Sequence, residues 1–471
     1  MSGVALDIGS RYARIARVGA HGKPELVELP GAVPGEGLPV PAGEGGGRDA
    51  ALRAAGSAYV REHGVPGRMV VVAPRRDRSG PSPGLGADAS AWLHGAGRTP
   101  PLSVLSTPHA VLALLRHAGT ATAGRYVVCD LGAAAAEVSV CVVTAGAVAV
   151  AGSARHAPAD GYGTGFEAAL LAEAGLPCDE AGRRVLAGVR AEDGAALRLD
   201  LALDRAGRNP ERYDATAVHR VAGRDITAGT VRLALRRLAA GLDLATAEAL
   251  DGAAPAPAPA PAEEASPAEE AARPPARAAV GGLVAVGGTA RFAPLLRHLT
   301  GGGWPLVTLP AGTDPALAAV YGAALVAAGL ADPADRYPYA VCVGAHRTVA
   351  GLTENQELLV CGAGLLEPGG AAVFAEAGGE RLRVRTGPAG AAAGRPMEVR
   401  VRNPEGAVSV PVRTLALPDG AEDDRFHLGV RLAVDGTARL VLRPLGAGPP
   451  TEFPLGELPT DLRTDPEGVR L

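Results

Sequence analysis

Two segments of the chain place an aspartate two residues before a glycine, between stretches of strand-forming side chains. Asp7 precedes Gly9 in the first segment, and Asp130 precedes Gly132 in the second. Glycine lets a backbone turn approach a phosphate closely, and the neighbouring carboxylate can hold the water shell of a phosphate-bound Mg²⁺. Either segment alone also fits an ordinary β-hairpin. The repeat of the pattern favours two related halves that grip one phosphate chain.

A third segment places paired glycines, Gly287 and Gly288, between the apolar run 283–286 and a helix-forming stretch. This pattern predicts a buried strand, a tight turn and a helix. A flat base can lie against the bare backbone of such a turn. Paired glycines taken singly are also explained by a simple strand-to-helix turn.

Together and in this order, the three segments resemble the first phosphate, second phosphate and adenosine motifs of the actin-like ATPases. Residues 106–110 resemble the first connecting helix of that superfamily, and residues 314–324 resemble its closing helix. Residues 163–167 are similar to the Gly-Gly-x-x-Phe-Asp segment of the DnaK-type (70-kilodalton) heat-shock proteins. The resemblance is strong through residue 330 and looser beyond it.

This resemblance implies an α/β actin-like (ribonuclease H-like) two-lobed nucleotide-binding domain over residues 1–330, followed by an all-β sandwich-like domain. Lobe I is expected over about 1–120 and lobe II over about 121–330. A linker is expected at 331–340, and the β-domain at 341–471. The β-domain resembles a chaperone peptide-binding domain. We expect it to lack the helical lid of such domains, because the chain after it is short and polar.

The resemblance also implies roles for single residues. Asp7 and Asp130 are expected to hold Mg²⁺, and with Glu137 they form the candidate catalytic set. The expected contacts to ATP or ADP are Gly9, Ser10, Arg11, Gly132, Ala133, Gly287, Gly288, Thr289 and Arg291. A polypeptide or protein partner is expected on the β-domain, with co-chaperones as further partners.

Several residues depart from the family's pattern. The family's phosphate-contacting lysine has no counterpart, since Lys23, in an early hairpin turn, is the only lysine of the chain, and Thr107 stands where the family has a glutamate. Alanines at 133–135 replace two glycines and a threonine of the second phosphate motif. A positioned water and a cationic clamp each lower the barrier by several kcal/mol, so we expect weak or absent hydrolysis. The alternative function is a non-catalytic scaffold or regulatory interaction protein on the same fold.

Regular elements must position these residues. The 3.6-residue apolar repeat of residues 226–250 predicts an amphipathic helix, and Asp314 with the following proline predicts the start of another helix that ends near residue 329. Period-two alternation over 397–402 and 427–443 predicts strands, the latter a hairpin that turns at an Asp-Gly pair. Residues 253–278, rich in Ala, Pro and Glu, predict a disordered insert.

Composition limits the remaining choices. The 471 residues favour two or three domains, and a net charge of −4 without a basic block argues against a nucleic-acid partner. The 65 glycines and 40 prolines, with one lysine, are typical of a high-GC genome.

Five scattered cysteines indicate a reducing compartment, and an acid within the first eight residues argues against export. The apolar stretches 138–154 and 316–330 are too weakly hydrophobic to span a bilayer, so we expect a cytoplasmic protein without a membrane partner.

Overall fold

A computed structural model describes most of the 471 residues. The described residues are 3–41, 46–73, 92, 102–190, 192, 194–253, 281–301, 303–349, 352–377, 380–384, 396–403, 408–416, 425–433, 437–446, 448–459 and 462. The expected insert, apart from residue 253, lies outside them. So do the Asp-Gly pair at 435–436 and most of the C-terminal segment.

An N-terminal sheet carries the first aspartate motif. Its strands are β1 (Gly3–Ile8), β2 (Tyr12–Val18), β3 (Pro24–Leu26), β4 (Leu38–Pro39), β5 (Arg68–Ala73) and β6 (Leu102–Ser106). The order is β3-β2-β1-β5-β6, with β4 also paired to β2. β1 and β2 form the expected hairpin, and the Gly9 amide closes its turn on the Tyr12 carbonyl oxygen at 3.0 Å.

A central sheet carries the second and third motifs. Its strands, in the order β12-β7-β8-β9, are β7 (Gly124–Leu131), β8 (Ala136–Val143), β9 (Val148–His156) and β12 (Gly282–Val286). The Gly132 amide closes the β7–β8 turn on the Ala135 carbonyl oxygen at 2.9 Å, as Gly9 does in the first hairpin. β12 runs parallel to β7, so Gly287 follows a strand that lies beside Asp130.

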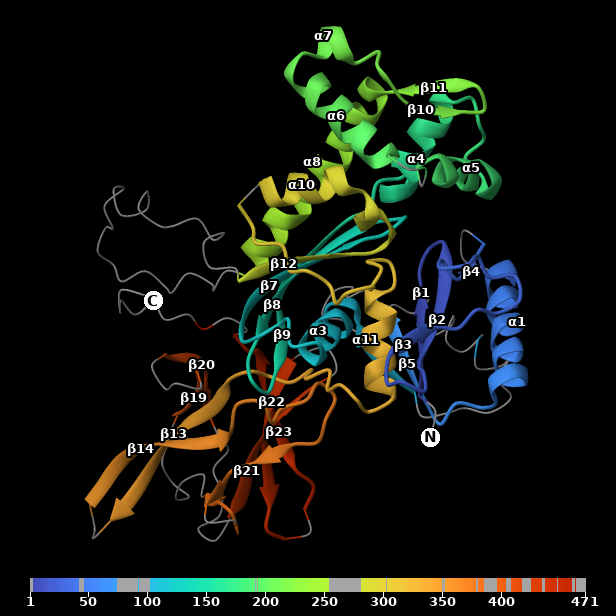
Figure 1. Ribbon diagram of the computed structural model, residues 1–471. Helices are drawn as coiled ribbons and strands as arrows, with labels where there is room; N and C mark the ends of the chain where they lie inside the picture. The colour runs from blue at the N-terminus through green and yellow to red at the C-terminus, as the bar shows by residue number, and fades with distance from the viewer. Residues whose placement is uncertain are drawn as a thin grey trace, which may run out of the picture.

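Two helices, α3 (Thr107–His117) and α11 (Ala318–Ala327), lie between the two sheets (Figure 1). Both helices and the facing side chains of the two sheets share one hydrophobic core. The helices cross closely because Gly322 faces the backbone of Ala110, where a Cβ atom would overlap the carbonyl oxygen. α11 begins later than expected, because Asp314 accepts the Ala316 amide at 2.8 Å and caps a turn before the helix.

Other helices cover the outer faces of the sheets. α1 (Gly46–His63) packs on the N-terminal sheet, in a segment for which the sequence predicted no helix. α8 begins at Ala228 and not at residue 226, since the Thr227 hydroxyl accepts the Thr230 amide. α8 packs on the central sheet, and the further elements gather on or beyond it (Figure 1): α4 (Tyr162–Glu173), α5 (Glu180–Arg190), α6 (Ala195–Arg208), α7 (Pro210–Tyr213), β10 (Ala217–Val221), β11 (Arg224–Thr227), α8 itself (Ala228–Gly252) and α10 (Ala293–Gly301).

The C-terminal region is β-rich. One sheet, in the order β14-β13-β19-β20, comprises β13 (Ala340–Val349), β14 (Leu352–Cys361), β19 (Pro396–Arg402) and β20 (Ser409–Ala416). The other comprises β15 (Val373–Phe374), β18 (Arg383–Val384), β21 (Phe426–Leu432), β22 (Thr437–Pro444) and β23 (Thr451–Glu457), beside the small pair β16 (Glu376–Ala377) and β17 (Glu380–Arg381). β21 and β22 pair as the hairpin pattern predicts.

Both C-terminal sheets contribute to one core, which also buries Tyr337 and Tyr339 of the expected linker. The chain is thus a mixed α/β unit followed by a β-rich region. Among the helices of the described residues, none has the length and apolar character needed to cross a bilayer.

Replacement of Gly322 by alanine tests the helix crossing. The added methyl group meets the Ala110 backbone, and overpacking of this kind costs about 1–3 kcal/mol of unfolding free energy. Gly188→Ala in α5 is the matched control, because its Cβ meets no atom within 4 Å. We expect the control to gain up to about 1 kcal/mol from helix propensity. Equal thermal unfolding of the two variants would contradict the close crossing.

Candidate functional site

The structure brings Asp7 and Asp130 together, although they belong to different sheets. Burial, and then the negative charge of Asp7, raise the pKa of Asp130 to about 6, while Arg14 and a hydrogen bond from the Thr107 hydroxyl act to lower it. Burial also raises the pKa of Asp7 against the opposing effect of Arg14. The two acids therefore share one low-dielectric site, where two full negative charges are unfavourable.

Arg14 is a member of this site that the motifs did not reveal. It lies directly across the β1–β2 pair from Asp7, so the two side chains share a face. Its Nη1 atom is 3.5 Å from Asp7 Oδ2, its Nε donates to the Glu36 carbonyl oxygen at 3.0 Å, and its side chain is only 11% exposed. The sequence could have indicated Arg14, because counting cross-strand pairs of the hairpin outward from the Gly9 turn places it opposite Asp7.

The acid pair does not fit Mg²⁺ as the side chains stand. The guanidinium of Arg14 already supplies positive charge to Asp7 and opposes a second cation at the same place. No group of three or more His, Cys, Asp or Glu side chains suited to a metal occurs in the described part of the chain. The expected roles of Asp7 and Asp130 as magnesium ligands thus gain no support from this arrangement.

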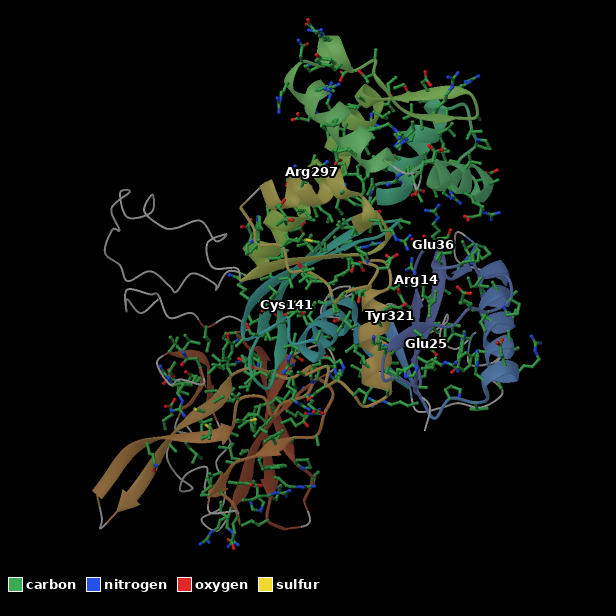
Figure 2. All side chains as sticks on the ribbon, viewed as in Figure 1. Arg14, Glu25, Glu36, Cys141, Arg297 and Tyr321 are labelled. Atoms are coloured by element: carbon green, nitrogen blue, oxygen red, sulfur yellow. The ribbon has the colours of Figure 1, made fainter. Side chains whose placement is uncertain are left out.

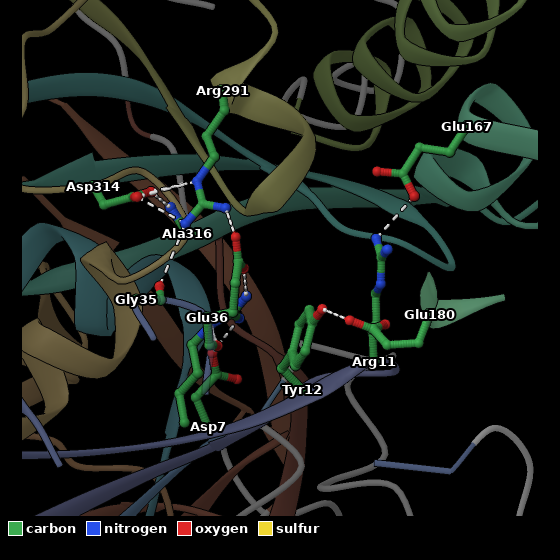
Figure 3. Close-up of polar contacts among 11 residues, drawn as sticks. Asp7, Arg11, Tyr12, Gly35, Glu36, Glu167, Glu180, Arg291, Asp314 and Ala316 are labelled. Carbon is green, nitrogen blue, oxygen red and sulfur yellow. Dashed lines mark hydrogen bonds and ion pairs between the residues drawn. The ribbon is translucent and has the colours of Figure 1, made fainter. Parts of the chain in front are cut away.

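Arg291, an expected nucleotide contact, joins the two sheets through Glu36. It lies in the short 3₁₀ helix η2 (Gly288–Arg291), and Figure 3 shows it reaching towards Asp314 and Glu36. Its Nε and Nη2 atoms are 2.9 and 2.7 Å from the two carboxylate oxygens of Asp314, and Nη1 pairs with Glu36. Although burial acts to raise it, hydrogen bonds from Arg291 and the Ala316 amide hold the pKa of Asp314 below its ordinary value.

Two more side-chain contacts cross between the N-terminal sheet and the helices of the central sheet (Figure 3). Arg11 Nη1 is 2.9 Å from Glu167 Oε2 on α4. The Tyr12 hydroxyl donates to Glu180 Oε1 on α5 at 3.1 Å. Arg11, expected at the phosphates, is therefore engaged by a carboxylate, and the neighbouring Ser10 is exposed in the turn.

The turn of the second hairpin uses the start of α4. The Gly132, Ala133 and Ala134 carbonyl oxygens accept the amides of residues 163, 164 and 162 at 3.3, 3.0 and 3.1 Å. Free amides at a helix N-terminus are a ready anion site. Because these amides are bonded to carbonyls, the start of α4 is not such a site here. Thr289 Oγ1 also donates to the Gly132 carbonyl oxygen, at 3.1 Å.

Paired glycines occupy the third motif as expected from the sequence. Gly287 has a φ of +91°, and a Cβ there would lie 2.6 Å from the Leu131 carbonyl oxygen and 2.8 Å from Asp130 Oδ1. A Cβ at Gly288 would meet no atom within 4 Å. The first glycine is therefore required by close packing on the acid site, whereas the second borders open space.

Glu137 lies across the β7–β8 pair from Asp130, on the same face of the sheet. Arg155 on β9 holds its carboxylate, with Nε 3.1 Å from Oε1. The structure thus places Glu137 near the acid pair, but in an ion pair of its own.

Comparisons with known proteins do not add to this picture. No protein-family model matches the chain, and no curated protein gives a significant match.

The pKa of Asp130 predicts a pH dependence of stability. Its folded-state value of about 6 exceeds the ordinary 3.8, so the folded protein binds the proton more tightly and loses stability as pH rises from about 4 to about 6. This increase in the pKa of Asp130 corresponds to a loss of roughly 3 kcal/mol of unfolding free energy above pH 6. Asp130→Asn should therefore be more stable than wild type at pH 8, by up to that amount, and similar to it at pH 4.

Urea unfolding at both pH values measures this difference. Glu248→Gln, which removes an exposed carboxylate from α8, is the control and should change little at either pH. An Asp130→Asn variant that is less stable than wild type at pH 8 would show that the carboxylate is stabilising in the folded protein.

Proposed function

We propose that this protein is a DnaK-like, actin-like nucleotide-binding protein with weak or absent ATP hydrolysis. In this proposal, the bound nucleotide controls polypeptide binding by the C-terminal β-rich region. One observation carries the proposal. The first turn of α3 contacts the acid pair on one side and the connection to the β-rich region on the other.

This double contact involves two residues of α3. Thr107 lies close to Asp130, and its hydroxyl acts to lower the pKa of that carboxyl. His109, 1% exposed, places Nε2 3.2 Å from Asp335 Oδ1 and 3.1 Å from the Val148 carbonyl oxygen. A shift of α3 that followed a change at Asp130 would therefore also alter the contact with Asp335.

The connecting segment also lies against the edge of the central sheet. The Val148 amide donates to the Ala334 carbonyl oxygen, and Val148 forms a parallel bridge with Asp335. Arg336 then bonds to Glu367 of the β-rich region at 3.1 Å. A pocket of about 420 Å³, lined by these segments and by Arg68, lies at this junction. Such a junction has room to rearrange, which a coupled connection requires.

Three arginines support nucleotide binding. Arg11 and Arg291 pair with carboxylates of the opposite half, and Arg14 pairs with Asp7. Guanidinium groups bind phosphate and carboxylate with the same planar geometry, so they can exchange one for the other. Open space beside Gly288 offers room for a base.

Weak hydrolysis follows from the groups nearest the acid pair. Thr107 has no acid–base function at neutral pH and already contacts Asp130. Lys23 lies in the β2–β3 turn, where its carbonyl oxygen accepts the Gly19 amide, and so it does not supply the phosphate-contacting lysine of the family.

A polypeptide would add to a strand edge of the β-rich region. β13 pairs with β19 only from Ala340 to Val343, and its remainder pairs with β14 alone. The β13–β14 hairpin accordingly extends away from the rest of the region in Figure 1. Within the described residues, β14 and β20 form the two edges of their sheet. Such edges accept an extended peptide through main-chain hydrogen bonds.

A second function, a non-catalytic scaffold, is favoured by a different observation. The contacts of Glu36, Glu167 and Glu180 hold the two halves together through protein groups alone. In that case these contacts stay in place and only the β-rich region binds partners. The two functions differ in whether nucleotide binds at all.

Calorimetric titration with ATP and ADP in the presence of Mg²⁺ separates the two functions. We expect micromolar binding, weakened about tenfold or more by Arg291→Ala, because a charge-assisted contact to the nucleotide is lost. Arg297→Ala is the matched control, since Arg297 makes a similar paired contact with Asp200, at 2.6 Å, outside the cleft. No heat at millimolar nucleotide would reject the nucleotide function and leave the scaffold.

Removal of the Asp335 charge tests the coupling. In Asp335→Asn, nucleotide affinity should stay within about twofold of wild type, while the effect of ATP on the affinity for a fluorescent extended peptide, about fivefold or more in wild type, should diminish. Asp243→Asn is the control, because Asp243 forms another His–Asp contact, 3.0 Å from His298. An unchanged ATP effect in Asp335→Asn would exclude this contact as the connection.

A further inference from the structure

Arg14 is fixed in place by the loop that follows β3. Gly37 of this loop has a φ of +107°, and a Cβ there would lie 2.6 Å from the Ala13 carbonyl oxygen and 3.0 Å from Arg14 Cγ. The Glu36 carbonyl oxygen accepts from Arg14 Nε. The guanidinium is therefore enclosed between Asp7 and the loop, and it cannot leave without disturbing the loop.

Arg14 and Arg291 share one carboxylate across the cleft. Glu36 pairs with Arg291 through Oε1, and its Oε2 is 3.9 Å from Arg14 Nη2. The two arginines come from β2 and from η2, and so from the two halves of the cleft. In Figure 2, Arg14 and Glu36 lie at the end of the N-terminal sheet nearest to α4 and α5. Two guanidiniums that converge on one carboxylate have the arrangement of an anion site, with Glu36 as its internal occupant.

We propose that Arg14 replaces the divalent cation of this cleft, so that the protein binds nucleotide free of metal, with a phosphate group held by Arg14 and Arg291 in the place of Glu36. This inference rests on the proposed nucleotide-binding function and names the form of the ligand. Glu36 then competes with the ligand in the empty protein.

The position of Arg14 favours this arrangement over a magnesium complex. Arg14 beside Asp7 forms a neutral pair, and an added cation would have to displace or tolerate a largely buried guanidinium at close range. A phosphate in the place of Glu36 would contact both guanidiniums, which keep their pairs with Asp7 and Asp314. Because Glu36 is 27% exposed, it can reach solvent with little rearrangement, whereas Arg14 cannot.

The test is calorimetric titration of the full chain with ADP, once with excess Mg²⁺ and once with EDTA. For wild type we expect dissociation constants within about twofold of each other. Glu36→Gln should bind ADP about tenfold more tightly in EDTA, because the internal carboxylate no longer competes, and Arg14→Gln should bind about tenfold more weakly or not at all. Inorganic tripolyphosphate should compete with ADP in EDTA.

The Arg17–Glu25 pair supplies matched controls. Arg17 lies on the same strand as Arg14, and its Nε is 3.1 Å from Glu25 Oε1 at an exposed position away from the cleft. Arg17→Gln and Glu25→Gln should leave both constants within about twofold of wild type. Thermal unfolding of every variant verifies that it is folded, and tripolyphosphate competition in wild type tests the anion site without any substitution.

The outcomes separate this inference from the proposed function. Binding that needs Mg²⁺ and falls at least about tenfold in EDTA overturns the inference but keeps nucleotide binding. Glu36→Gln binding that is unchanged or weaker overturns the role of Glu36 as a competitor. Absence of ADP binding under both conditions rejects the nucleotide function itself, and the inference with it.

Discussion

The close crossing of α3 and α11 is the constraint on which the acid pair depends. Only a residue without a side chain fits where α11 faces the Ala110 backbone, and this contact keeps both helices in one thin layer between the sheets. A thin layer brings the ends of β1 and β7 close enough for Asp7 to affect the charge of Asp130. The electrostatics of the site thus follow in part from the packing of small residues in these two helices.

The sequence contains enough information for the hairpins and the glycine turn, because each is specified by a few neighbouring residues. Gly9, Gly132 and Gly287 occupy the turns that the spacing predicts. The charge partners could not be found in this way. The pairing of Arg291 with Glu36 joins residues 255 positions apart, and no local pattern encodes it. α1 was missed because its Ala/Gly-rich sequence has little amphipathic periodicity.

Likewise, sequence motifs reveal only some of the residues that come together in the site. The motifs located the two aspartates, but Arg14 emerges only when strand register is considered, and the use of the α4 amides by the 132–134 carbonyls requires tertiary contact. The difference is physical. A turn is decided by backbone conformation, whereas the net charge of a cleft is decided by whichever side chains the fold brings within a few ångströms.

The docking of the connecting segment on Val148 has a consequence for self-association. β9 is the edge strand of the central sheet, and the segment at 334–335 occupies part of that edge. Whenever the segment detaches, backbone groups at the edge become available to a strand from another molecule. Detachment of the connecting segment would break the same hydrogen bonds that protect the β9 edge from pairing with another molecule. At high protein concentration, a short-lived detachment is therefore favoured over a long one.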